Sequence, residues 1–299
     1  FGAGQLVQGV SNAFYGLGRL YLGLDSYLPA AGEIVDSGQT VLTNLQVLSG
    51  LSVSREVTVP NSGAQDFART IDAFTNPTGS PITTTVKIVG NLGSDATTQI
   101  FNSSAGFSPA RLDLNTNTID DDRDGVADEG DEFTYHVSWI GTDDATDNGG
   151  TPAIIHYIDG PNGLDPLVMN IVEDNIYWIY EITVPANSTV RLAYFTIIDD
   201  SRTIAIADAN ELVTPTGFGG QAATFLTPTE LDLIVNFHYN TPPVAQASSA
   251  TTNEDTAKTF AVTDFFYSDV EGNSLASITF SGLSLASGDA LTVDLGFGL

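Results

Sequence analysis

Short segments in which apolar and polar residues alternate recur along most of this chain, and they constrain its fold more than any other feature. A period of two residues places successive side chains on opposite faces of a β-strand. Turn-forming clusters such as 61–63 and 185–187 separate the segments. Many short strands at this spacing are typical of an antiparallel β-sandwich, so we predict an all-β fold of that class. The predicted strands are 13–23, 40–48, 51–59, 66–74, 81–91, 97–102, 132–140, 153–158, 176–184, 188–198 and 230–238.

One segment, residues 201–213, has helical rather than alternating spacing, so we expect one short helix there. A helix packed on a sandwich need not have a chemical role. The residues suited to cap its start are Asp199, Asp200 and Ser201. The expected apolar stripe consists of Ile204, Ala207, Leu212 and Val213.

An acidic segment between two predicted strands has the spacing of a calcium loop. Residues 120–131 read D-D-D-R-D-G-V-A-D-E-G-D, with Gly125 directly after the third alternate aspartate. Carboxylates this close repel one another unless a cation lies among them, and calcium takes about six to eight oxygen ligands. The spacing resembles thrombospondin type 3 loops and is close to dockerin and EF-hand loops. The alternative is a solvated acidic loop. The predicted ligands are Asp120, Asp122, Asp124, the Val126 carbonyl, Asp128, and Asp131 or Glu132.

The charge balance limits the partners of the chain. With 37 acidic and 9 basic residues, the net charge of −28 disfavours nucleic acid and anionic membranes, which both require a basic surface. No segment has the length and hydrophobicity of a membrane-spanning helix. Cysteine is absent, so no disulfide stabilises the fold. This composition favours an extracellular, calcium-rich setting.

The first part of the chain, about 1–238, has six segments with a recognisable pattern: 50–60, 67–69, 76–78, 81–83, 90–95 and 231–237. Together they resemble a β-sandwich module of unknown function that recurs in large secreted bacterial proteins. The resemblance implies a fold and a bacterial extracellular or cell-surface location, not an activity. Two arginines in this part, Arg55 and Arg69, stand out among so few basic residues. They either contact an anionic ligand or form ion pairs between strands, and we favour the ion pairs.

The second part, 239–299, contains N-T-P-P-V-A from Asn240, E-D-T from Glu254, and S-D-V-E-G-N-S-L from Ser268. This pattern resembles a bacterial cadherin-like repeat, an Ig-like sandwich found in tandem in adhesins. Calcium binding between neighbouring domains is what the resemblance implies, with an ordinary acidic turn as the alternative. Asn273 departs from the family, where many relatives have a third acid. The implied ligands are Glu254, Asp255, Asp269 and Glu271.

The second part is too short for a complete domain of this kind, because an Ig-like sandwich needs roughly 100 residues. We therefore expect that sequence beyond Leu299 completes it, or that an identical subunit adds a strand, as in a filament. The chain starts at Phe1, which suggests a piece of a longer protein.

Catalytic motifs are not apparent. The three histidines, His136, His156 and His238, lack zinc-site spacing, and neither a G-x-S-x-G elbow nor a P-loop occurs. Asp143, Asp144 and Asp147 form either a second ion site or, as we favour, a mobile surface loop. A further aromatic group forms either a sugar-stacking platform or, as we favour, part of the core. Its members are Tyr157, Tyr177, Trp178 and Tyr180.

Two functions follow from these patterns, neither of them enzymatic. The favoured one is a calcium-stabilised structural or adhesive module of a large bacterial surface protein or fibre, whose partners are neighbouring domains or identical subunits. The alternative is a carbohydrate-binding accessory module of a secreted enzyme, whose partners are glycans.

Overall fold

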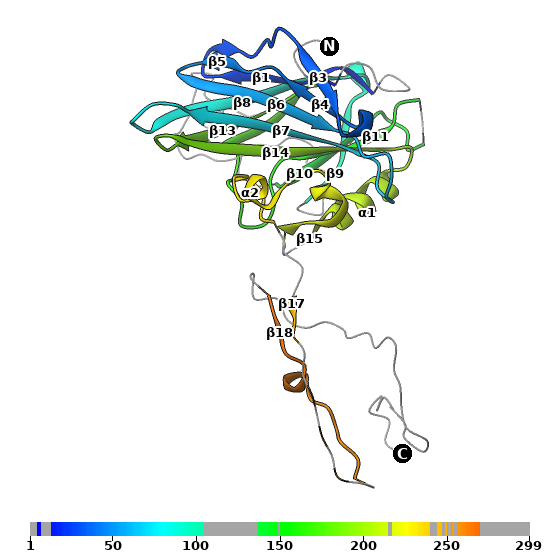
Figure 1. Ribbon diagram of the computed structural model, residues 1–299. Helices are drawn as coiled ribbons and strands as arrows, with labels where there is room; N and C mark the ends of the chain where they lie inside the picture. The colour runs from blue at the N-terminus through cyan, green and yellow to red at the C-terminus, as the bar shows by residue number, and fades with distance from the viewer. Residues whose placement is uncertain are drawn as a thin grey trace, which may run out of the picture. The chain divides into compact units, whose positions relative to one another are not determined.

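The structure is a computed structural model whose chain divides into two compact units, Phe1–Asn240 and Thr241–Leu299. The first unit contains two antiparallel sheets packed as a sandwich, which confirms the predicted fold class (Figure 1). The structure describes residues 5–6, 13–104, 137–148, 150–214, 217–239, 244–246, 249, 251, 253 and 256–269.

The smaller sheet has five strands in the order β12-β13-β8-β1-β2. Its longest ladder joins β13 to β8 from Asn175↔Asn91 to Val184↔Ile82. Two shifts in register interrupt the ladder between β1 and β8, where Gly16 and Gly18 adopt positive φ. The strands are β1 (Phe14–Leu22), β2 (Asp25–Ser26), β8 (Ile82–Leu92), β12 (Val168–Val172) and β13 (Asn175–Val184).

The larger sheet has nine strands in the order β3-β4-β6-β7-β14-β11-β10-β9, with β5 pairing to the end of β6 beyond β4. Its strands are β3 (Gly32–Val35), β4 (Thr40–Thr43), β5 (Gln46–Leu48), β6 (Leu51–Thr58), β7 (Phe67–Asn76), β9 (Gln99–Ser103), β10 (Trp139–Asp143), β11 (Ala153–Tyr157) and β14 (Ser188–Asp199).

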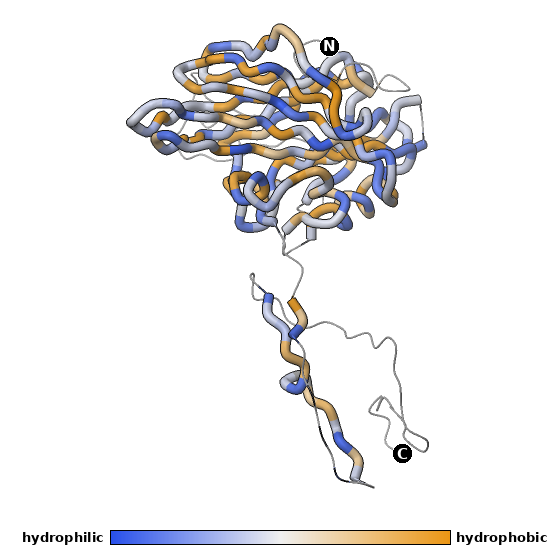
Figure 2. Tube along the Cα trace, viewed as in Figure 1, coloured by the Kyte–Doolittle hydropathy of each residue, from blue (hydrophilic) through white to orange (hydrophobic). Residues whose placement is uncertain are grey.

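The main core lies between the two sheets and follows from the alternation in the sequence. In β13, every second side chain from Ile176 to Val184 is buried against the larger sheet, while the residues between them face outward. Figure 2 shows the same change between apolar and polar residues along other strands of the sandwich. The opposite face of the smaller sheet is therefore the polar one.

A second core covers the other face of the larger sheet, so that sheet is buried on both sides over β14 and β11. Helix α1 (Arg202–Leu212) packs on β10, β11 and β14, and α2, β15 and β16 lie on the same side (Figure 1). The covering elements are α1, α2 (Pro228–Leu231), β15 (Val213–Thr214), β16 (Gly217–Phe218) and the short 3-10 helix η4 (Gly220–Ala223).

The helix predicted at 201–213 is confirmed as α1, but its buried stripe differs from the prediction. Ala205, Ala209 and Leu212 are buried, whereas Ile204 is 50% exposed and Ala207 is also exposed. Ser201 occupies the cap position without a side-chain cap bond. Of the four predicted stripe residues, Leu212 and Val213 are buried, with Val213 just beyond the helix. The prediction is wrong for Ile204 and Ala207, because α1 turns Ala205 and Ala209 toward the sheet instead.

The strand predicted at 230–238 is wrong. The chain instead begins α2 at Pro228, where Thr227 and Glu230 form a capping box and proline occupies the first turn. The predicted run 40–48 is also interrupted, because β4 ends at Thr43 and β5 begins at Gln46. Alternation alone did not reveal β3 or β12, which are short and lie at sheet edges.

In the second unit, the described strands β17 (Val244–Ala245) and β18 (Tyr267–Ser268) pair antiparallel, and the 3-10 helix η5 spans Val262–Asp264. Most of the predicted Ig-like domain lies outside the described residues. None of the helices in the described parts of the chain is long and apolar enough to cross a membrane.

Candidate functional site: the outer face of the five-stranded sheet

The predicted calcium ligands from Asp120 to Glu132 lie outside the described residues, as do Glu254, Asp255 and Glu271. Asp269 is described and partly buried just after β18. The described acidic and histidine residues form no cluster of three or more that could hold a metal ion.

The described residues on either side of the predicted calcium segment lie close together. The strands that flank it, β9 and β10, pair with each other in the larger sheet. The Ser104 amide donates to the Trp139 carbonyl at 3.1 Å, and the Ser138 amide donates to the Ser104 hydroxyl at 2.8 Å. Ser104 and Ser138, the described residues near either side of the acidic segment, are therefore hydrogen-bonded neighbours.

The loop containing Asp143, Asp144 and Asp147 is neither an ion site nor a loose surface loop. The Arg202 guanidinium donates to the Asp143 carboxylate at 2.7 Å and to the Asp144 carbonyl at 2.8 Å. The Asp147 carboxylate accepts the Arg202 amide at 3.0 Å. Burial raises the pKa of Asp143, and the bond from Arg202 opposes that rise. The loop holds the start of α1.

Arg55 lies fully buried between the sheets and forms the ion pair that the sequence favoured. Its guanidinium donates to both carboxylate oxygens of Asp72, at 2.6 and 2.8 Å, and to the Tyr194 hydroxyl at 2.6 Å. It also donates to the Gly18 carbonyl of β1, in the opposite sheet. Burial alone lowers the pKa of Arg55, but Asp72 and Tyr194 more than offset this and raise it. This group therefore joins the two sheets.

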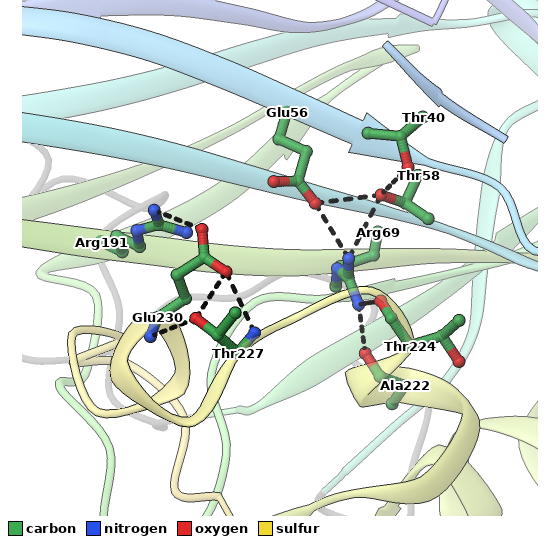
Figure 3. Close-up of polar contacts among 9 residues, drawn as sticks. All are labelled: Thr40, Glu56, Thr58, Arg69, Arg191, Ala222, Thr224, Thr227 and Glu230. Atoms are coloured by element: carbon green, nitrogen blue, oxygen red, sulfur yellow. Dashed lines mark hydrogen bonds and ion pairs between the residues drawn. The ribbon is translucent and has the colours of Figure 1, made fainter. Parts of the chain in front are cut away.

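Arg69 likewise forms an interstrand ion pair, with Glu56 at 3.0 Å, and it donates to the Thr58 hydroxyl at 3.2 Å. Its other nitrogen donates to the carbonyls of Ala222 and Thr224, as Figure 3 shows. Arg69 thus fastens the layer around η4 to the larger sheet. The same view shows a second ion pair between the larger sheet and the elements that cover it, from Arg191 in β14 to Glu230 in α2 at 2.9 Å.

The two described histidines, His156 and His238, lie in different environments. His156 is 1% exposed in β11, and one ring nitrogen contacts the Thr142 hydroxyl at 2.9 Å. Burial lowers its pKa to about 3, so the ring is neutral near pH 7. His238 is exposed, and its backbone carbonyl accepts a bond from the Phe218 amide. His136 lies outside the described residues.

The aromatic platform is wrong as a binding surface, because three of its four members are buried. Trp178 is 2% exposed and packs edge-on against Tyr194, at 5.5 Å between ring centroids. Tyr180 and Tyr157 are 0% and 6% exposed. Tyr177 alone faces the outer side of the smaller sheet, between the inward-facing Ile176 and Trp178.

The face of the five-stranded sheet that points away from the larger sheet, here called the outer face, carries basic and tyrosine side chains that are not part of the core. Cross-strand pairing sets Tyr177 opposite Val89, and Val89 opposite Arg19. The next row pairs Lys87 with Tyr21 across β8 and β1. Arg19 is exposed, whereas Tyr21, Lys87 and Tyr177 are partly exposed. Three adjacent strands thus present two cations and two tyrosines.

Polar side chains extend the outer face on both sides of these rows. Asn91 pairs with Asn175 across β8 and β13, and its amide donates to the Asp174 carboxylate at 2.9 Å. Glu181 pairs with Thr85 in the row beyond Lys87. The β12 margin is closed, because Val168 and Asn170 are 1% and 4% exposed. The accessible part therefore runs over β13, β8 and β1.

The basic side chains of the outer face differ from those of the rest of the sandwich in their ion pairing. Arg55, Arg69, Arg191 and Arg202 each form an ion pair with a carboxylate. Within the described residues of the first unit, Arg19 and Lys87 are the basic side chains without such a pair. The Lys87 ammonium instead lies 4.4 Å from the Tyr177 ring centroid.

Sequence reasoning missed the outer face. Alternation assigned Arg19 and Tyr21 to one side of a strand, but it did not show that β1 adjoins β8 and that β8 adjoins β13. Those neighbours are far apart in the sequence, so the clustering exists only in the folded sheet.

Comparison with known proteins places the chain in no family: no family model matches it, and no curated protein matches it. Among solved structures, it is similar to a proposed kojibiose phosphorylase from the human microbiome (13% identity, TM-score 0.38), covering 66% of this chain and 25% of that one. It is also similar to a polysaccharide lyase (12% identity, TM-score 0.33), covering 66% and 28%. A third is a galactose mutarotase-like protein from Lactobacillus casei (12% identity, TM-score 0.32), covering 59% and 74%.

This chain thus spans about a quarter of the length of the first two proteins. At TM-scores of this size, none of the three similarities bears on what the chain binds.

Proposed function

We propose that the β-sandwich is a non-catalytic carbohydrate-binding module of an extracellular protein, and that glycan binds on the outer face. The observation that supports it most is the placement of Arg19 and Lys87. Among the described residues they form no ion pair with a carboxylate, in a chain of net charge −28, and they lie beside Tyr21 and Tyr177 on one face of the smaller sheet.

The chemistry of these groups suits a saccharide. A tyrosine ring offers an apolar face to the C–H groups of a sugar and a hydroxyl at its edge. Cationic nitrogens donate hydrogen bonds to sugar oxygens. The exposed Asn175 amide can add one, because only one of its two N–H groups is bonded to Asp174. The accessible part over β13, β8 and β1 is closed only along its β12 margin, which suits an extended polysaccharide better than a small molecule enclosed in a pocket.

A glycan array tests this function. Saccharide binding should occur, and Tyr177→Ala and Tyr21→Ala should each weaken it at least tenfold while the protein stays folded. Ile34→Ala is the matched control, because Ile34 is 61% exposed on the larger sheet and should not matter. Absence of binding across the array, or equal binding by all three variants, would refute the proposal.

A second candidate function is the calcium-stabilised structural module, with neighbouring domains or identical subunits as partners. The acidic spacing of 120–132 supports it, together with the position of that segment between the paired strands β9 and β10. Ser104 and Ser138 already bond to each other, so an ion bound in the chain between them would restrain a loop that is already closed, at little further cost in chain entropy.

Thermal unfolding with and without chelator tests this second function. Calcium at about one hundred times its dissociation constant should add roughly 2.7 kcal/mol to the free energy of unfolding. Asp124→Ala should abolish most of that gain, and the exposed Asp232→Ala should leave it intact. A melting temperature that is the same with and without chelator would contradict the calcium-stabilised function.

A further inference from the structure

We infer, resting on the carbohydrate-binding function proposed above, that the outer face selects saccharides bearing carboxylates, such as chains of uronic acid units. The contact between Lys87 and Tyr177 carries this inference. The Lys87 ammonium lies 4.4 Å from the ring centroid, over the surface that a sugar would use for stacking. A ligand that stacks on Tyr177 must therefore first displace Lys87.

Neutral and acidic sugars differ in what this displacement costs. A neutral sugar that stacks on the ring displaces the ammonium and removes its cation–π attraction. In exchange, the ammonium gains only hydrogen bonds to neutral oxygens. A sugar carboxylate offers the displaced ammonium a charge-assisted hydrogen bond, which is stronger than a neutral one. Lys87 therefore disfavours neutral ligands and favours anionic ones at the same ring.

Arg19 supplies a second anion contact on the same face. It pairs with Val89, which pairs on its other side with Tyr177, so Arg19 and Tyr177 stand in one row two strands apart. Two strand spacings amount to about 10 Å, within reach of successive units of one polysaccharide chain. A guanidinium binds carboxylate in two-pronged geometry, and Arg19 has no carboxylate partner among the described residues.

The net charge of −28 opposes an anionic ligand at long range but not at contact. Exposed charges farther away than about 8 Å are largely screened at physiological ionic strength. The two cations lie in the two central rows, and the carboxylates of Glu181 and Asp174 lie in the rows that flank them on either side. Affinity should therefore pass through a maximum as salt rises, because screening first removes the repulsion and later weakens the contacts.

Calorimetric titration of the full chain in chelator tests the selectivity without calcium bridging. The probes are galacturonate and alginate oligomers, each beside its carboxyl-reduced, neutral counterpart. At least one acidic oligomer should bind tenfold or more tightly than its reduced form. Lys87→Gln should remove most of this preference by weakening the acidic ligand and not the neutral one, and Arg19→Gln should weaken the acidic ligand at least threefold.

Lys258→Gln, in the second unit, is the matched control and should leave both affinities unchanged. Reduced oligomers that bind as well as the acidic ones, or a preference that survives Lys87→Gln, would overturn the selectivity. If neutral glycans on the array bind through Tyr177 and the acidic oligomers do not, the selectivity fails while the carbohydrate-binding function stands. If no saccharide binds, both fail.

Discussion

The interior of the sandwich and its outer face combine the same kinds of side chain in opposite ways. Inside, the Arg55 guanidinium lies 5.9 Å from the Tyr194 ring centroid and donates to Asp72. Outside, Lys87 lies over Tyr177 and has no carboxylate partner within the part of the chain that the structure describes. A cation beside a tyrosine is thus structural in one place and a candidate ligand contact in the other. Burial and pairing, rather than residue type, distinguish the two roles.

The largest effect should come from the interior. Asp72→Ala leaves Arg55 charged and buried without its partner, and removal of one member of such a pair costs about 3–5 kcal/mol. Urea unfolding monitored by tryptophan fluorescence measures this loss. A loss of less than about 1 kcal/mol in the free energy of unfolding would mean that the buried pair contributes no more than a surface ion pair. The contrast between the interior and the outer face would then be wrong.

Two adjacent residues of β13 sharpen the comparison, because Trp178 faces the core and Tyr177 faces the outer side. Trp178→Ala should cost about 3–5 kcal/mol through the cavity it leaves. Tyr177→Ala should cost about 1 kcal/mol or less and affect glycan binding instead. Circular dichroism melts of both variants supply the measurement, and the reverse order of stability would contradict the assigned faces.

The interior should also respond to pH. His156 has a pKa of about 3 in the folded protein against an ordinary value of 6.5. Between these two pH values its side chain is therefore protonated in the unfolded chain and neutral in the folded one. Its contribution to stability is therefore present above pH 6.5 and is lost as pH falls toward 3. The slope is at most about 1.4 kcal/mol per pH unit. His156→Gln should flatten the urea midpoint against pH in this window, whereas His238→Gln should not.

The smallest effect on stability should come from the outer face. Lys87→Gln and Arg19→Gln should each change the free energy of unfolding by about 0.5 kcal/mol or less, because neither side chain holds an ion pair within the described part of the chain. The same urea titrations provide the test. A loss comparable with that of Asp72→Ala would show that these cations are structural.

Local patterns in the sequence predicted the strands and α1 because alternation and helical spacing depend on neighbouring residues. The α2 capping box at Thr227–Glu230 was also a local signal, and a search for T-x-x-E would have found it. The break after Thr43 was not readable, because the Thr43 hydroxyl bonds to the backbone of Arg55 across the sheet. The interstrand pairing of Arg55 and Arg69 was predicted, but their partners Asp72 and Glu56 depended on register.

The last residues of the first unit have a mechanical consequence. The Asn236 side chain donates to the Ile158 carbonyl and accepts from the Ala193 amide, which links the end of the sandwich to β14 and to the chain beyond β11. The Val235 carbonyl accepts from Leu164, and the Asn236 carbonyl accepts from Gly160. Separation of residues 235–236 from the sandwich would therefore have to break bonds to β14 and to the chain beyond β11 together, rather than one after another.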